Sequence, residues 1–102
     1  MKKFYGGIFI EKEKLISAGI QYPIKLEYSK TINTEDTVNK EIYGIHIVKT
    51  EYKEKINVEE KKIEYITDNE NQANEILKIF KENEVTPISA QYIIDDMLKQ
   101  NI

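Results

Sequence analysis

Two helical stripes of apolar residues, separated by a proline, constrain the fold of this chain more than any other feature. In each stripe, apolar side chains recur at the three- and four-residue spacing of one helix face. Pro87 lies between them, and proline lacks an N–H group and disfavours helical geometry in the residue before it. The sequence therefore predicts two antiparallel helices that each bury one face. The stripes consist of Ala73, Ile76, Leu77 and Phe80, and of Ala90, Ile93, Ile94, Met97 and Leu98.

Short polar residues predict where these two helices begin. Thr67 or Asp68 is expected to cap the first helix, because such side chains accept a hydrogen bond from a free N–H of the first turn, and the helix is expected to continue to about Asn83. The second helix has two candidate N-cap residues: Thr86, with the proline at the first helical position, or Ser89. We favour Ser89, because the isoleucines before and after it would then form a hydrophobic staple.

Three segments upstream of the helices have the composition of β-strands. Residues 4–10 are aromatic and β-branched, and Gly6 and Gly7 indicate a bulge or a close backbone approach. Residues 24–29 alternate strictly between apolar and polar, which is typical of a half-buried strand. Residues 41–50 carry apolar side chains on both faces, which is typical of a central strand.

The connections between these strands differ in how well the sequence defines them. Residues 11–22 fit either a turn with one helical loop or a continuation of the strand, and they stay unassigned. Residues 31–40 are polar and are predicted to form a mobile loop. Residues 53–55 are charged and predict a hairpin before a returning strand at residues 56–66. The apolar alternation of that strand changes phase, so we expect a bulge or bend near residues 59–62.

Together these elements predict a single α+β domain, residues 1–102: an antiparallel sheet of three to five strands with a C-terminal helix hairpin packed on one face. Tyr43, Ile45 and Ile47 are expected to face the helices. The other face of that strand is then either covered by the N-terminal segment or open to a partner, because exposed apolar groups on a central strand usually mark an interface. This candidate interaction surface carries Ile42, His46 and Val48.

Composition limits the chemistry available to the chain. Hydrophobic residues make up 40% and charged residues 32%, which is typical of a folded domain. Cysteine is absent, which excludes disulfides, thiolate metal sites and cysteine nucleophiles. The chain has no apolar run of the roughly 18 residues that a spanning helix needs. Charges from Glu11 to Lys14 end the N-terminal apolar run too early for a signal peptide, so we expect a mature cytoplasmic protein that does not bind membranes.

No constellation of residues in the sequence indicates catalysis, a cofactor or a metal ion. His46 is the only histidine, and no second histidine, cysteine nucleophile or glycine-flanked serine accompanies it, so we expect a structural role. Asp95 and Asp96 are adjacent, and neighbouring helix positions diverge by about 100°. They are therefore expected on a solvated helix face, with Asp95 paired to Lys99, or facing the basic surface of a partner.

Nucleic-acid binding is weakly supported. The net charge is −3, lysines and glutamates alternate, and arginine, which reads guanine edges and clamps phosphates, is absent. An AT-rich genome also explains the lysine bias. Seven tyrosines are available for stacking, but most lie in strand or helix patterns that predict packing.

Several segments in the C-terminal half of the chain carry a family resemblance. They are Tyr43–Lys49 (YGIHIVK), the charged hairpin, Ile63–Asp68, the amphipathic helix, and Val85–Ile88 (VTPI) leading to Ile93–Leu98 (IIDDML). Together they resemble a family of short uncharacterised proteins from clostridia and related Firmicutes. The similarity covers about residues 40–99, and the first forty residues do not contribute. The resemblance implies a low-GC bacterial cytoplasmic protein and no reaction, cofactor or substrate.

The sequence therefore favours a non-enzymatic interaction or regulatory module that binds a protein partner or self-associates, most simply as a homodimer. Its candidate surface comprises Ile42, His46, Val48, Asp95 and Asp96. The alternative is a small-molecule sensor, which needs a pocket between sheet and helices lined by Tyr43, Tyr65 and Tyr92.

Overall fold

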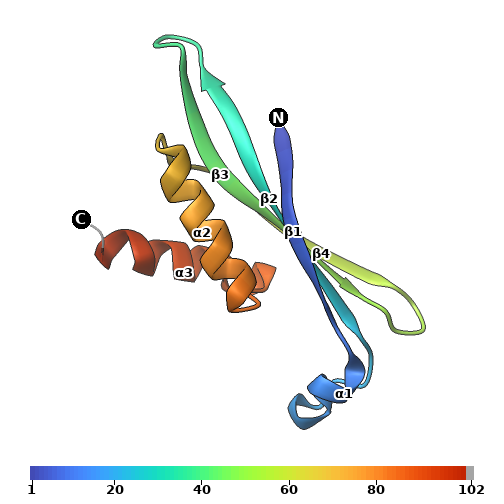
Figure 1. The fold of residues 1–102 in the computed structure, drawn as a ribbon. Helices are drawn as coiled ribbons and strands as arrows, with labels where there is room; N and C mark the ends of the chain where they lie inside the picture. Colours follow the sequence, from blue (N-terminus) through green and yellow to red (C-terminus); the bar gives the residue numbers. More distant parts are fainter. Residues whose placement is uncertain (101–102) are drawn as a thin grey trace.

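The structure, a computed structural model that describes residues 1–100, is a four-stranded antiparallel sheet followed by two helices. This is the predicted α+β arrangement. The strands lie in the sheet in their order along the chain, and α2 and α3 lie together on one side of it (Figure 1). The elements are β1 (Lys2–Ile10), α1 (Lys12–Leu15), a 3-10 turn (Ile16–Ala18), β2 (Ile24–Glu35), β3 (Lys40–Glu51), β4 (Asn57–Thr67), α2 (Glu70–Glu82) and α3 (Pro87–Gln100).

The core lies between the sheet and the two helices. Tyr43, Ile45 and Ile47 of β3 are buried and face the helices, as predicted. Every residue of the first apolar stripe is buried. In the second stripe Ala90 and Ile94 are buried, and the other three residues are partly exposed and pack against the core. The hydrophobic cluster consists of Ile10, Ile24, Leu26, Tyr28, Ile45, Ile47, Ile76, Leu77, Phe80, Val85, Ala90 and Ile94.

The first helix begins later than predicted. Its cap is Asn69, whose side-chain oxygen accepts a hydrogen bond from the Gln72 N–H at 3.1 Å, so the prediction of Thr67 or Asp68 is wrong. Thr67 instead accepts from the Asn69 N–H at 3.0 Å, and Asp68 forms an ion pair with Lys40. The Thr67 hydroxyl also donates to the Gln72 side-chain oxygen at 2.5 Å, so Thr67 and Asp68 fix the approach to the helix without capping it.

The second helix begins at Pro87, so Thr86 precedes it and the preference for Ser89 is wrong. The Ser89 N–H donates to the Thr86 carbonyl at 3.1 Å within the first turn. The predicted staple does not form, because Ile88 is 88% exposed. The axes of α2 and α3 are visibly inclined to each other, so the predicted antiparallel pair is an oblique one (Figure 1).

The predicted loop at residues 31–40 is mostly strand. β2 continues to Glu35 and β3 begins at Lys40, and Glu35 pairs with Lys40, which leaves only residues 36–39 as the turn. Asn39 adopts φ 49° there, a conformation that asparagine tolerates. Backbone ladder hydrogen bonds do not depend on side-chain polarity, so polar residues continue the hairpin, which projects past the helices (Figure 1).

Two bulges interrupt the regular pairing. The first lies between Phe4 and Gly6, where the glycines predicted it. The predicted bulge at residues 59–62 is misplaced, because pairing is regular from Asn57 to Ile63 and shifts only beyond that point, opposite Gly44. The change of apolar phase has another cause: Val58 points to the face away from the helices and is 57% exposed.

The unassigned residues 11–22 take the helical alternative. α1 and the following 3-10 turn end at Gly19, which adopts φ 79°. Within residues 1–100, no helix has the length and apolarity required to cross a membrane.

Candidate interaction surface

The sheet face that points away from α2 and α3 is here called the open face. Ile42, His46 and Val48 all lie on it, as predicted, since alternate residues of β3 share a face. The N-terminal segment does not fold over it but forms β1 at the sheet edge, and no other element within residues 1–100 covers it. Its cross-strand rows are Phe4, Ser29, His46 and Lys62; Gly7, Glu27, Val48 and Glu60; and Phe9, Lys25, Thr50 and Val58.

Large apolar side chains are exposed at several points of the open face. Phe4 is 61% exposed, and Phe9 and Val58 are each 57% exposed. The ring of Phe4 lies 3.8 Å from the position that a side chain on Gly7 would take, which is an ordinary van der Waals distance, so Phe4 lies beside Gly7 on this face. Phe9 packs against Tyr52 with ring centroids 6.1 Å apart. The open face therefore presents two separated aromatic groups to solvent.

His46 lies at the centre of this face and is only 5% exposed. Its Nδ1 atom lies 3.1 Å from Nζ of Lys2, so the ammonium donates to Nδ1 and the imidazole proton is on Nε2. Nε2 is 3.8 Å from the nearest Glu60 carboxylate oxygen, which is too far for a hydrogen bond. Burial, and next the Lys2 ammonium, lower the pKa of His46 below its ordinary 6.5. His46 is therefore neutral at physiological pH.

Buried polar atoms without a hydrogen-bond partner gather on the same face. Within residues 1–100 these side-chain atoms are Thr31 Oγ1, Asn33 Nδ2 and His46 Nε2, and all three residues point to the open face. A buried donor or acceptor without a partner costs about 1–3 kcal/mol. The face thus combines polar atoms that lack partners with exposed apolar groups, and exposed apolar groups are typical of a surface that contacts another molecule.

The lowered pKa of His46 predicts a specific loss of stability in mild acid. Below about pH 6.5 the unfolded chain binds a proton more readily than the folded chain, so the free energy of unfolding falls as the pH falls. His46→Gln, which still offers Lys2 an acceptor, should flatten this slope in urea unfolding measured between about pH 6.5 and 5. Glu51, Asp68 and Glu70 have lowered pKa values and titrate below that window. An unchanged slope in the variant contradicts this assignment.

Asp95 and Asp96 are exposed on α3 and therefore lie on the other side of the sheet from His46. The predicted pair between Asp95 and Lys99 is absent from the ion pairs of residues 1–100. Instead Asp95 accepts a hydrogen bond from Gln91 at 3.0 Å, and Asp96 accepts one from Gln100 at 3.2 Å. The structure thus separates the two parts of the predicted surface.

The tyrosines required for a sensor pocket are also separated. Tyr43 is buried against the helices, whereas Tyr65 is 72% exposed and Tyr92 is 78% exposed. Tyr65 lines a cleft of about 800 Å³ with Ile42, where the projecting hairpin meets the end of β4. An enclosed pocket formed by all three tyrosines is incompatible with these exposures.

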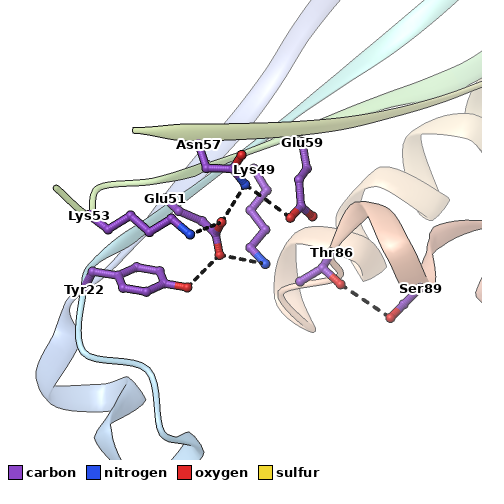
Figure 2. A network of polar contacts seen from close by, with 8 residues as sticks. All are labelled: Tyr22, Lys49, Glu51, Lys53, Asn57, Glu59, Thr86 and Ser89. Atoms are coloured by element: carbon purple, nitrogen blue, oxygen red, sulfur yellow. Dashed lines mark hydrogen bonds and ion pairs between the residues drawn. The ribbon is translucent and has the colours of Figure 1, made fainter. Parts of the chain in front are cut away.

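Sequence reasoning missed a polar cluster around Glu51, at the end of β3 (Figure 2). Glu51 is 7% exposed and accepts hydrogen bonds from Asn57 at 2.7 Å and from Tyr22 at 2.9 Å. The ammonium groups of Lys49 and Lys53 lie 3.5 and 3.9 Å from its oxygens. The Asn57 hydrogen bond, then Tyr22 and the lysines, lower the pKa of Glu51. Because all its partners come from this chain, the carboxylate ties the β1–β2 connection to β3 and β4.

No sequence signal marked Glu51, which sits beside a charged hairpin and resembles a solvated residue. Its partner Tyr22 comes from the β1–β2 connection and its partner Asn57 from the start of β4, and only the folded sheet brings them together. In the described part of the chain, no three His, Asp or Glu residues are grouped to hold a metal ion. The hydrogen bonds of Glu51 to Tyr22 and Asn57 give the cluster a structural role, since they join the β1–β2 connection to the sheet.

Comparison with known families places the whole domain in one group. A family model described as "Family of unknown function (DUF6514)" matches residues 7–100. No curated protein and no solved structure matches the chain. The family match extends well beyond residues 40–99 and includes most of the N-terminal segment, to which the resemblance in sequence did not extend. The chain therefore belongs to the DUF6514 family of unknown function.

Proposed function

We propose that this protein is a non-enzymatic interaction module that self-associates as a homodimer through the open face, in a regulatory or adaptor role in the bacterial cytoplasm. One observation carries the proposal. The described residues with unpartnered buried polar atoms all point to the same uncovered face as Phe4, Phe9 and Val58, which are each more than half exposed. The lysine-only basic residues are consistent with the AT-rich genome of a clostridial source.

The dimensions of the open face support a stable contact between two copies. β2 and β3 each contain 12 residues, which gives a length of about 40 Å at about 3.3 Å per residue, and four strands spaced about 4.8 Å apart give the sheet a width of about 20 Å. A typical specific interface buries about 800 Å² on each partner. A sheet of this size can supply that area without help from the helices.

The charges of the open face suit a second copy of the same chain. Lys2, Lys25 and Lys62 alternate across it with Glu27 and Glu60, and Lys25 already pairs with Glu27 at 3.7 Å. In a two-fold symmetric interface the same patch meets itself, so a surface with both signs of charge can pair lysines with glutamates across the axis. A face with one sign of charge would instead repel its copy.

Replacing Phe9 with glutamate should shift the protein from dimer to monomer. A charge buried in the contact without a partner should raise the dissociation constant at least about tenfold, or 1.4 kcal/mol. Light scattering and sedimentation at micromolar concentration should give twice the monomer mass for the wild type and the monomer mass for Phe9→Glu.

Ile88→Glu is the matched control, because Ile88 is 88% exposed on α3, away from the open face. It introduces the same charge at an exposed apolar site and should leave the dimer intact. A wild-type protein that is strictly monomeric, or equal effects of the two substitutions, contradicts the proposal. Circular dichroism of each variant verifies that the fold is retained.

A further inference from the structure

The two edge strands of the sheet are protected to different degrees. β4 carries four consecutive charged residues, 59–62, and charged side chains on an edge strand discourage pairing with another chain. β1 is 9 residues long and carries charges only at Lys2 and Lys3, after which it is aromatic, glycine-rich and aliphatic. β1 is therefore the edge at which an additional strand meets least resistance.

The backbone of β1 offers hydrogen-bonding groups toward solvent. Met1 and Ile32 exchange two hydrogen bonds, with N···O distances of 3.0 and 2.8 Å. Bonded and non-bonded pairs alternate in an antiparallel ladder, so the N–H and C=O groups of Lys2 and Phe4 point away from β2. The same alternation along β2 directs the backbone groups of Gly7 and Phe9 outward beyond the bulge.

A groove of about 710 Å³ runs between this edge and α2. Tyr5 and Leu77 contribute to its lining, and Lys3 and Lys78 contribute exposed ammonium groups. An extended chain that pairs with β1 would direct every second side chain into this groove. Its other side chains would continue the open face beside Phe4 and Phe9.

The charge of the groove favours an acidic strand. Lys30 is already satisfied, with Nζ 2.5 Å from Glu70 and 3.1 Å from Asn74. Lys3 and Lys78 have no ion-pair partner within 4 Å in residues 1–100. Of the two carboxylates that line the groove in the described chain, Glu70 is paired with Lys30 and Glu75 is in no ion pair. Lys81 adds a further ammonium beside Gly6. The surplus of positive charge therefore calls for carboxylates on the incoming segment.

We propose that the edge of β1 binds an extended segment of another protein as a fifth strand, with alternating acidic and apolar side chains. The acidic side chains enter the groove beside Lys3 and Lys78, and the apolar ones lie beside Phe4 and Phe9. A second copy of β1 does not fit this description, because β1 contains no carboxylate. This site adjoins the open face at Phe4 and Phe9, and strand addition does not require the dimer.

A fluorescent peptide of nine residues, matched to the length of β1 and alternating glutamate with valine, tests the proposal. Fluorescence anisotropy should show saturable binding that weakens with salt, because the contact is partly ionic. A lysine–valine peptide of the same length should not bind. Lys3→Glu combined with Lys78→Glu should weaken binding of the acidic peptide at least about tenfold, because two attractive contacts become repulsive.

Two controls separate strand addition from simple charge attraction. Lys61→Glu reverses a charge on the β4 edge, on the face opposite the open face, and should leave peptide affinity unchanged. A glutamate–valine peptide with N-methyl groups on alternate amides cannot donate to the ladder, so it should bind much more weakly. Amide exchange at Phe4, Gly7 and Phe9 should slow when the unmodified peptide binds. Equal binding of the methylated and unmodified peptides, equal binding of the lysine peptide, or no binding of the acidic peptide overturns the proposal.

Discussion

Gly44→Ala is expected to lower the free energy of unfolding by about 3 kcal/mol or more, since overpacking a fixed backbone contact has costs at the top of the usual range. A methyl group on Gly44 would lie 2.1 Å from the Ile63 carbonyl oxygen and 2.5 Å from both Cα and the carbonyl oxygen of Glu64. These are backbone atoms of the β4 bulge and cannot move aside as a side chain can. The substitution should therefore open the β3–β4 pairing at this point.

Urea unfolding of Gly44→Ala and Gly6→Ala compares a clash with fixed backbone atoms with a close contact to a flexible side chain. At Gly6 the nearest atoms belong to the flexible Lys81 side chain, at 3.3 and 3.4 Å. That variant should change stability by less than about 1 kcal/mol, because the lysine can shift and alanine restricts the unfolded chain. Equal stability of the two variants would show that β4 does not cross Gly44 as closely as described.

Phe80→Ala is expected to destabilise the domain by about 3–5 kcal/mol. Phe80 is fully buried at 0% exposure, in the cluster that joins α2 to the sheet. Truncation removes the ring from the core and leaves a cavity that the packed strands and helices can fill only partly. The loss is a large fraction of the roughly 5–15 kcal/mol that stabilises a typical domain.

Tyr92→Ala provides the matched control for this aromatic truncation. Tyr92 is 78% exposed on α3, so its removal should change the free energy of unfolding by less than about 0.5 kcal/mol. Thermal and urea unfolding of both variants give the comparison. A similar loss in both, or none in Phe80→Ala, would mean that α2 is not held to the sheet by this cluster.

The helical periodicity of the apolar residues predicted the core well, because only the helix face that is buried against the sheet needs apolar side chains. Ala73, Ile76, Leu77 and Phe80 are all buried against the sheet, and the two-sided apolar pattern of β3 placed that strand centrally. The hairpin at residues 31–40 could not be found in this way. Its strands are held by backbone pairing between Thr31 and Gly44 and onward to the turn, and backbone pairing leaves no apolar signature in the sequence.

The candidate surface was predicted in part. The strand pattern placed His46 opposite the helices, but whether anything covers it depended on the position of the N-terminal segment, which pairs at the edge. The burial of Lys30 and Glu51 was not predicted, because charged residues are usually exposed and are buried only when they are paired. Glu70 lies 40 residues from Lys30, and Tyr22 lies 29 residues from Glu51, so local sequence carried no sign of either contact.

Dipolar distances between spin labels show whether two copies meet through the open face. The chain has no cysteine, so Lys62→Cys on the open face and Asp96→Cys on α3 each provide one unique labelling site. In the proposed dimer, the two labels at residue 62 lie closer together than the two labels at residue 96, which are on the outer sides of the assembly. No dipolar coupling at residue 62, or a shorter distance at residue 96, would contradict a dimer that forms through the open face.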